Sequence, residues 1–146
     1  MSSAAARGRR GMSNDTKARS GISNIGVVMF TVADQDAAKE WYTTVLGFEV
    51  RSDSRFGPND EYRWLEVAPP GSAARLALNP PMFDQPGGGS IGVETADVAA
   101  EHARLSAIGG VDLDAAPDDS TPGAPKLFMM RDPDGNNIAV VEVPAG

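Results

Sequence analysis

The chain has 146 residues, of which 41% are hydrophobic and 23% are charged, and these values are typical of one globular domain. It contains no Cys and a single His, His102, which excludes disulfides, thiolate metal sites and any site that needs two imidazoles. The net charge of −7 argues against nucleic acid as a partner, because an acidic surface repels phosphate backbones. No apolar run approaches the roughly 18 residues of a membrane span, so we expect no membrane partner.

Residues 1–23 differ from the rest of the chain in charge and composition. Their net charge is +4, with Asp15 as the one acidic residue, whereas the remaining chain carries −11. Ser, Ala, Gly and Arg dominate without apolar periodicity, so we expect a disordered basic tail. A transit peptide and a start of translation at Met12 are both compatible with this composition. Because no apolar segment follows the arginines, we expect no secretory signal and a cytoplasmic protein.

The first regular elements lie between residues 24 and 80. Residues 25–32 alternate as a strand, Asp34 predicts the start of a helix that continues to residue 45, and Gly47 ends it. A strand over 48–51 precedes a loop over 52–60 that is rich in Gly, Pro and Asp. Two further strands are predicted over 62–67 and 75–79.

The same order of elements recurs after a linker over residues 81–89. It comprises a strand over 91–95, a helix over 98–108 capped by Asp97, a short strand over 111–113 and a loop over 114–125. Strands over 127–131 and 137–142 then form a hairpin around Asp134-Gly135, a strong turn signal. Asp34 and Asp97 are 63 residues apart, and so are Gly47 and Gly110.

This spacing predicts an α+β fold of two tandem βαβββ modules, at 24–80 and 90–143, within one domain over residues 24–146. A single ferredoxin-like domain with added segments is the alternative.

Three groups of residues resemble the vicinal oxygen chelate superfamily of glyoxalases, bleomycin-resistance proteins and extradiol dioxygenases. They are residues 32–34 (VAD), Trp41-Tyr42 followed by residues 45–48 (VLGF), and residues 132–136 (DPDGN). The resemblance covers about residues 25–143. It implies that the two modules curl a mixed sheet around a cavity, with the helices on the outer face.

The resemblance also implies where a metal ion would bind. Metal-dependent members carry His, Gln or Glu at the start of each first strand and Glu on each fourth strand. The matching positions here hold Val27, Ala77, Ser90 and Ala139, and only the Ser hydroxyl has a side-chain electron pair to donate. We therefore expect no metal and no other cofactor. Glyoxalase and dioxygenase mechanisms, which need a Lewis acid, are disfavoured.

Strand alternation predicts which side chains line the cavity. The predicted lining mixes apolar walls with a few polar groups, as small-molecule sites do. It consists of Met29, Thr31, Tyr62, Trp64, Glu66, Arg75, Asn79, Ser90, Phe128 and Met130. We expect Ala139 to pair with Met130 across the last hairpin. This register places Phe128 and Met130 on the wall opposite Trp64 and Arg75.

Several of these residues also have a purely structural interpretation. Trp64 either fills the core or stacks on a ligand, and Met29 and Met130 are adaptable packing residues. Glu66 and Arg75 form either a structural ion pair or a ligand-binding pair. We expect His102 to pack at the edge of its helix, and residues 132–136 to serve turn geometry.

The sequence predicts a metal-independent small-molecule-binding protein of the bleomycin-resistance type, whose cavity holds an aromatic or amphipathic ligand. The alternative is an enzyme of the lyase, isomerase or dioxygenase class, in its metal-free form with Glu66 as the acid/base group. A third possibility is a structural or interaction role, with side chains filling the cavity. Because one βαβββ unit leaves an apolar edge and half a cavity uncovered, we expect a homodimer.

Overall fold

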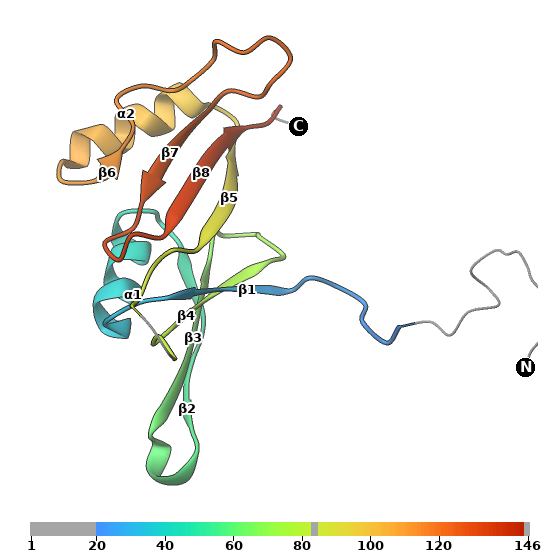
Figure 1. Cartoon of the computed structure of the whole chain (residues 1–146), viewed down its shortest axis with the longest axis vertical. Helices are drawn as coiled ribbons and strands as arrows, with labels where there is room; N and C mark the ends of the chain where they lie inside the picture. Colours follow the sequence, from blue (N-terminus) through green and yellow to red (C-terminus); the bar gives the residue numbers. More distant parts are fainter. Residues whose placement is uncertain (1–19, 83–84, 145–146) are drawn as a thin grey trace, which may run out of the picture.

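The computed structural model describes residues 20–82 and 85–144 (Figure 1), so most of the predicted basic tail lies outside the described residues. The first group of elements is β1 (Val27–Thr31), α1 (Gln35–Thr44), β2 (Glu49–Phe56), the 3₁₀ helix η2 (Pro58–Asp60), β3 (Tyr62–Ala68) and β4 (Arg75–Asn79). The second group is β5 (Ser90–Thr95), α2 (Val98–Ile108), β6 (Asp112–Leu113), β7 (Leu127–Arg131) and β8 (Asn137–Glu142). Within the described residues, neither helix is long and apolar enough to cross a membrane.

The two groups form two mixed sheets of equivalent topology. The strand order is β1-β4-β3-β2 in the first sheet and β5-β8-β7-β6 in the second. In each sheet the first strand pairs with the fourth in parallel, and the other pairs are antiparallel. The predicted α+β fold of two βαβββ modules is thus confirmed, and the two separate sheets exclude a single ferredoxin-like domain.

Both helices begin where the sequence predicts. The Asp34 carboxylate accepts a hydrogen bond from the backbone N–H of Ala37, and Asp97 does the same for Ala100. Such N-caps satisfy backbone donors that have no partner within the helix. Each helix packs against its own sheet, so one face of that sheet is covered and apolar (Figure 1).

Strand β2 is longer than the sequence predicts. Residues 52–56, expected in a loop, pair with β3 as far as Phe56 opposite Tyr62. The two rings lie 5.4 Å apart and contribute a cross-strand aromatic contact. The pairing with β3 therefore prevails over the turn-forming composition of this segment, and β2 and β3 form a long projecting hairpin (Figure 1).

The β7–β8 hairpin has a different register from the predicted one. Ala139 pairs with Met129, and Met130 pairs with Ile138. The connection over residues 132–136 has the predicted length, but it closes with Arg131 directly opposite Asn137, and the Asp132 carboxylate holds it by accepting hydrogen bonds from the backbone N–H groups of Asp134 and Asn136. A shift of one residue moves every side chain of a strand to the other face.

Phe128 and Met130 therefore lie in the core under α2, both with no exposed surface. The edge of the His102 ring contacts Phe128 at 5.0 Å between ring centroids, and His102 Nε2 lies 2.7 Å from the carbonyl oxygen of Asp114. The predicted placement of Phe128 and Met130 on the cavity wall is wrong. The position of His102 agrees with the expected packing role.

Residues 132–136 also join the two modules. The Tyr42 hydroxyl of α1 donates a 2.7 Å hydrogen bond to Asp132 Oδ2, and Asn136 Nδ2 donates to the carbonyl of Thr31. Tyr42, Asp132 and Asn136 are all buried. Burial and the neighbouring Asp132 charge raise the pKa of Tyr42 far above its ordinary value. This segment therefore does more than form a turn, because it fixes the second module on the first.

Candidate functional site

The face of the first sheet that points away from α1 carries most of the predicted site residues. We call it the open face, and its central positions are set by the pairs Met29 with Ala77 and Ala77 with Glu66. By strand register and alternation, seven predicted residues lie on it: Met29, Thr31, Tyr62, Trp64, Glu66, Arg75 and Asn79. The opposite face, with Phe30 and Leu65 among its side chains, is buried in the core.

Three of these side chains form a connected polar group at the centre of the open face. Trp64 Nε1 donates a 2.8 Å hydrogen bond to Glu66 Oε2, and Arg75 Nε lies 3.2 Å from Glu66 Oε1. Glu66 is buried, Trp64 is half-buried and the Arg75 side chain is 42% exposed. We call these residues the Trp-Glu-Arg group.

The geometry of the Trp-Glu-Arg group restricts what Glu66 can do. One carboxylate oxygen accepts from the indole and the other faces the guanidinium, so both are engaged. These contacts hold the carboxylate in one orientation, and a proton from a bound molecule would have to reach one of its remaining lone pairs. The group is better suited to hold an aromatic surface and a cation in fixed positions.

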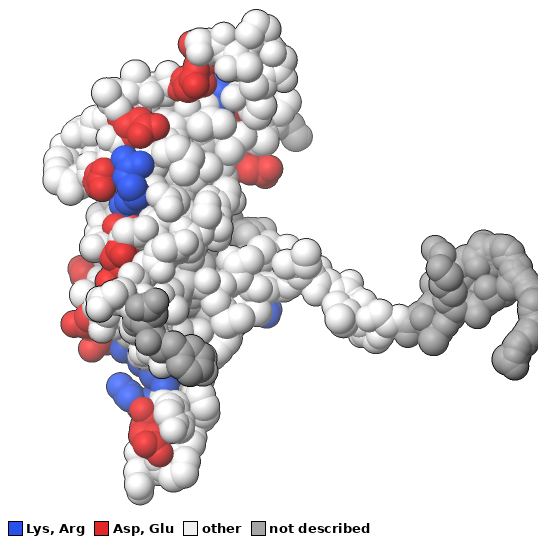
Figure 2. All heavy atoms as spheres, in the orientation of Figure 1, with Lys and Arg blue, Asp and Glu red and all other residues white. Residues whose placement is uncertain are grey.

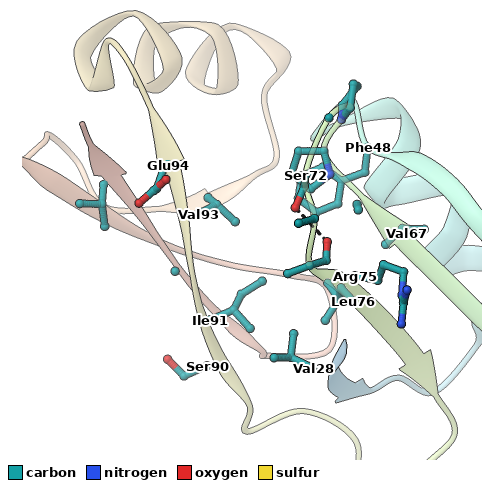
Figure 3. A pocket seen from close by; sticks show the side chains of 18 residues that line it. Val28, Phe48, Val67, Ser72, Arg75, Leu76, Ser90, Ile91, Val93 and Glu94 are labelled. Carbon is teal, nitrogen blue, oxygen red and sulfur yellow. Dashed lines mark hydrogen bonds between the residues drawn. The ribbon is translucent and has the colours of Figure 1, made fainter. Parts of the chain in front are cut away.

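A hollow lies between the modules. It is an open crevice of about 810 Å³ between the β3–β4 turn and β5, with apolar walls that include Val28, Val67, Leu76, Ile91 and Val93 (Figure 3). The sequence reasoning missed it, because its two walls face each other only when the second module docks on the first.

Two predicted site residues, Arg75 and Ser90, contribute to this crevice. The guanidinium of Arg75 points away from it in Figure 3, toward the open face. Arg51 supports the β3–β4 turn, since its Nη1 and Nη2 donate to the carbonyl oxygens of Ser72 and Pro69. Ser90 is exposed on β5, so the structure does not bring it to the Trp-Glu-Arg group.

The four positions at which the resemblance implies metal ligands do not fit a metal ion. Val27 and Ala77 lie on β1 and β4, and Ser90 and Ala139 lie on β5 and β8. Only Ser90 offers a side-chain oxygen, and one neutral hydroxyl is a poor ligand alone. Elsewhere in the described part of the chain, no three His, Asp or Glu side chains are grouped to hold an ion.

The model of the Glyoxalase/Bleomycin resistance protein/Dioxygenase superfamily matches residues 24–140. The chain belongs to this superfamily. A curated relative, the uncharacterized protein YetH of Bacillus subtilis, is 32% identical over 124 residues, which cover 83% of this chain and 99% of YetH.

Solved structures of this superfamily share the fold. A member from Sphaerobacter thermophilus is 30% identical with a TM-score of 0.74, and covers 84% of this chain and 98% of its own. TnmS3, an antibiotic binding protein from a Streptomyces species, is 32% identical with a TM-score of 0.71, and covers 87% of this chain and all of its own. The resemblance drawn from the sequence motifs is thus confirmed.

Proposed function

We propose that this superfamily member is a cytoplasmic, metal-independent protein that binds a small aromatic or amphipathic molecule on the open face. The observation that carries the proposal is the Trp-Glu-Arg group, in which one buried carboxylate holds a half-buried indole and a partly exposed guanidinium. The similarity to TnmS3, an antibiotic binding protein, supports a binding role over a catalytic one.

The side chains around the Trp-Glu-Arg group suit a flat apolar ligand. Met29 and Tyr62 are 62% and 53% exposed, and Phe56 beside Tyr62 is 51% exposed. Aromatic rings provide a large contact area at low cost in side-chain entropy, and Met adapts to irregular shapes. Thr31 and Asn79 add polar atoms at the margin of the open face.

We propose that a second copy of the chain covers the open face and closes the site. Exposed apolar side chains gathered on one face are typical of an interaction surface. In the described sheets β1 and β5 are edge strands, and each leaves one side unpaired. A two-fold dimer would cover both edges and the apolar crevice between the modules, and would supply the missing wall.

Ligand binding can be tested with the fluorescence of Trp64. The chain has two tryptophans, so Trp41→Phe leaves Trp64 as the only reporter. A library of aromatic and amphipathic compounds is screened by thermal shift, and hits are titrated against this variant. We expect hits to change Trp64 emission and to bind Trp64→Ala at least tenfold more weakly. If no compound shifts the Tm and Trp64→Ala unfolds the protein, Trp64 is a core residue and the proposal is wrong.

Dimerisation is tested separately by light scattering on the purified protein. We expect a dimer for the unmodified chain and a folded monomer for Met29→Asp, because a carboxylate at an exposed position of the open face would be buried without a partner. Glu40→Asp on α1 serves as the control with no change in charge. A monomer for the unmodified chain at high concentration would contradict this part of the proposal.

The alternative, a metal-free enzyme with Glu66 as the acid/base group, rests on the presence of a buried carboxylate on the open face. It predicts that Glu66→Gln binds the ligand but no longer converts it, which product analysis by mass spectrometry would reveal. Metal independence has its own test. Purified protein without a tag should contain no stoichiometric Zn, Ni, Fe or Mn, and one transition metal per chain would overturn it.

A further inference from the structure

The open face presents a positive charge where a ligand would arrive. Its strand positions carry the cation Arg75 and two anions, Glu66 and Glu49, and Glu49, opposite Ala68, forms an ion pair with Arg51 at 2.6 Å. The other positions are neutral: Val27, Met29, Thr31, Ser52, Ser54, Phe56, Tyr62, Trp64, Ala77 and Asn79. We infer that the ligand is an aromatic carboxylate whose acidic group binds Arg75, an inference that rests on the proposed binding function.

The two charges of the Trp-Glu-Arg group differ in accessibility. The Glu66 side chain is 11% exposed and its oxygens face Trp64 and Arg75, whereas the Arg75 side chain is 42% exposed. An approaching molecule therefore meets the guanidinium before the carboxylate. The exposed surface of this ion pair attracts an anion.

Arg75 also has N–H donors that are available to a ligand. A guanidinium carries five N–H donors, and the contact with Glu66 uses the Nε side alone. Even there, Nε makes no directed hydrogen bond to any described residue. Among the described carboxylates only Glu66 pairs with Arg75, so the two Nη atoms can bind a carboxylate in the bidentate geometry that Arg favours.

The backbone beside Arg75 keeps this edge of the guanidinium open. Nη2 lies near Gly26, and a Cβ atom placed on Gly26 would be 3.5 Å from it. A larger side chain at residue 26 would therefore cover the donors. Figure 2 shows acidic side chains mainly along the side of the molecule that carries α1 and α2, with others at the end of the β2–β3 hairpin and on the opposite edge of the second module.

The indole and the guanidinium are held at a fixed spacing by one carboxylate. Glu66 Oε2 accepts from Trp64 and Glu66 Oε1 faces Arg75, so the two groups lie on either side of the same carboxylate. A molecule with a carboxylate attached directly to an aromatic ring places its two recognition elements at a comparably short spacing. Such a ligand can contact Trp64 and Arg75 together.

Naphthoate and naphthamide provide a matched pair of probes, which differ in charge and have the same ring. Calorimetry measures their Kd for the unmodified protein and for Arg75→Gln, Glu66→Gln and Arg55→Gln. Arg55→Gln is the control, because Arg55 is exposed on the other face of β2 and loses the same charge.

We expect naphthoate to bind the unmodified protein more tightly than naphthamide does. Loss of a charge-assisted contact in Arg75→Gln should weaken naphthoate binding by roughly 10- to 100-fold and leave naphthamide binding unchanged. Glu66→Gln should tighten naphthoate binding several-fold, because it removes the competing carboxylate. Arg55→Gln should change neither Kd.

Opposite effects of Arg75→Gln and Glu66→Gln on naphthoate binding separate recognition from stability, since a loss of folding would weaken binding in both variants. Equal binding of the two probes, or an equal loss of both in Arg75→Gln, overturns the inference and leaves the proposed function standing. If Arg75→Gln does not fold, Glu66→Gln decides, and unchanged or weaker naphthoate binding overturns the inference. If neither the probes nor any library compound binds, the proposed function itself is wrong.

Discussion

The hydrogen bond between Tyr42 and Asp132 offers a direct test of how the two modules are joined. Tyr42→Phe removes one oxygen atom and keeps the ring in its contacts with Trp41 and Phe48, whose centroids lie 4.9 and 5.7 Å away. The buried Asp132 carboxylate then loses a 2.7 Å hydrogen bond at Oδ2 and retains its contacts with Asn136. The substitution thus isolates one contact between the modules.

The expected cost follows from the charge and burial of the acceptor. A hydrogen bond to a charged group contributes about 1.5–3 kcal/mol, and a buried carboxylate that loses a donor incurs a desolvation penalty of similar size. For a chain of this length, about 3 °C of Tm corresponds to 1 kcal/mol, so we expect a decrease of about 5–9 °C. Differential scanning calorimetry measures it, and chemical denaturation gives the change in the free energy of unfolding.

The matched control is Tyr62→Phe, which removes the same atom from the chain's other tyrosine. Tyr62 is 53% exposed, so its hydroxyl can bind water in the folded protein. We expect a change of less than about 0.5 kcal/mol, as for most surface substitutions.

The pH dependence gives a second readout of the same contact. The pKa of Tyr42 is raised in the folded state above the ordinary value of about 10. Its contribution to stability is therefore fully present below pH 10 and is lost as the pH rises further, because the unfolded chain ionises first. The difference in Tm between the unmodified protein and Tyr42→Phe should be constant from pH 6 to pH 9 and should shrink above pH 10.

The Tyr62→Phe variant allows a spectroscopic check, since Tyr42 is then the only tyrosine. Phenolate absorbance should appear together with unfolding and not before it. Equal Tm values for Tyr42→Phe and Tyr62→Phe, or titration of Tyr42 in the folded protein near pH 10, would refute the proposed junction between the modules.

Two further predictions concern the second sheet and the surface. Phe128→Ala should destabilise the protein by about 3–5 kcal/mol, because it leaves a cavity under α2. Met129→Ala, on the other face of β7, should cost about 1 kcal/mol. Similar small losses for both variants in thermal denaturation would instead support the placement of Phe128 on the cavity wall. Hydrogen bonds from Arg63 and Lys39 lower the pKa of Asp53, so Asp53→Asn should cost about 1 kcal/mol or less at pH 7. This difference should decline as the pH falls below about 4, because Asp53 then binds a proton in the unfolded chain while it stays ionised in the folded protein, and a pH-independent difference in Tm would contradict it.

The elements of this fold follow from local sequence signals. Asp34 and Asp97 begin the helices because a carboxylate at that position satisfies backbone donors that the helix leaves free. The constant spacing between them predicts the duplicated module. The caps depend on neighbours within a few residues and the spacing can be counted along the chain, so both signals can be recognised without the tertiary structure.

The open face was also predictable, because strand alternation alone sorts the side chains of β1, β3 and β4 between two faces. Most helix-facing side chains of these strands are apolar, Phe30, Leu65 and Leu76 among them, and this pattern fixed the faces that the predicted site residues occupy. The ion pair between Glu66 and Arg75 was suggested by their proximity on one hairpin. The simultaneous contact of Glu66 with Trp64 and Arg75 became visible only from the observed pairing of β3 with β4.

The tertiary structure decided the register of β7 and β8 and the position of the second module. Asp132 accepts hydrogen bonds from the backbone N–H groups of Asp134 and Asn136 in a connection that closes with Arg131 opposite Asn137, and it also accepts one from Tyr42, which lies 90 residues earlier. A contact over such a separation leaves no trace in local composition. Because a side chain's face changes with every residue of register, this one carboxylate determines that Phe128 lies in the core instead of facing a ligand.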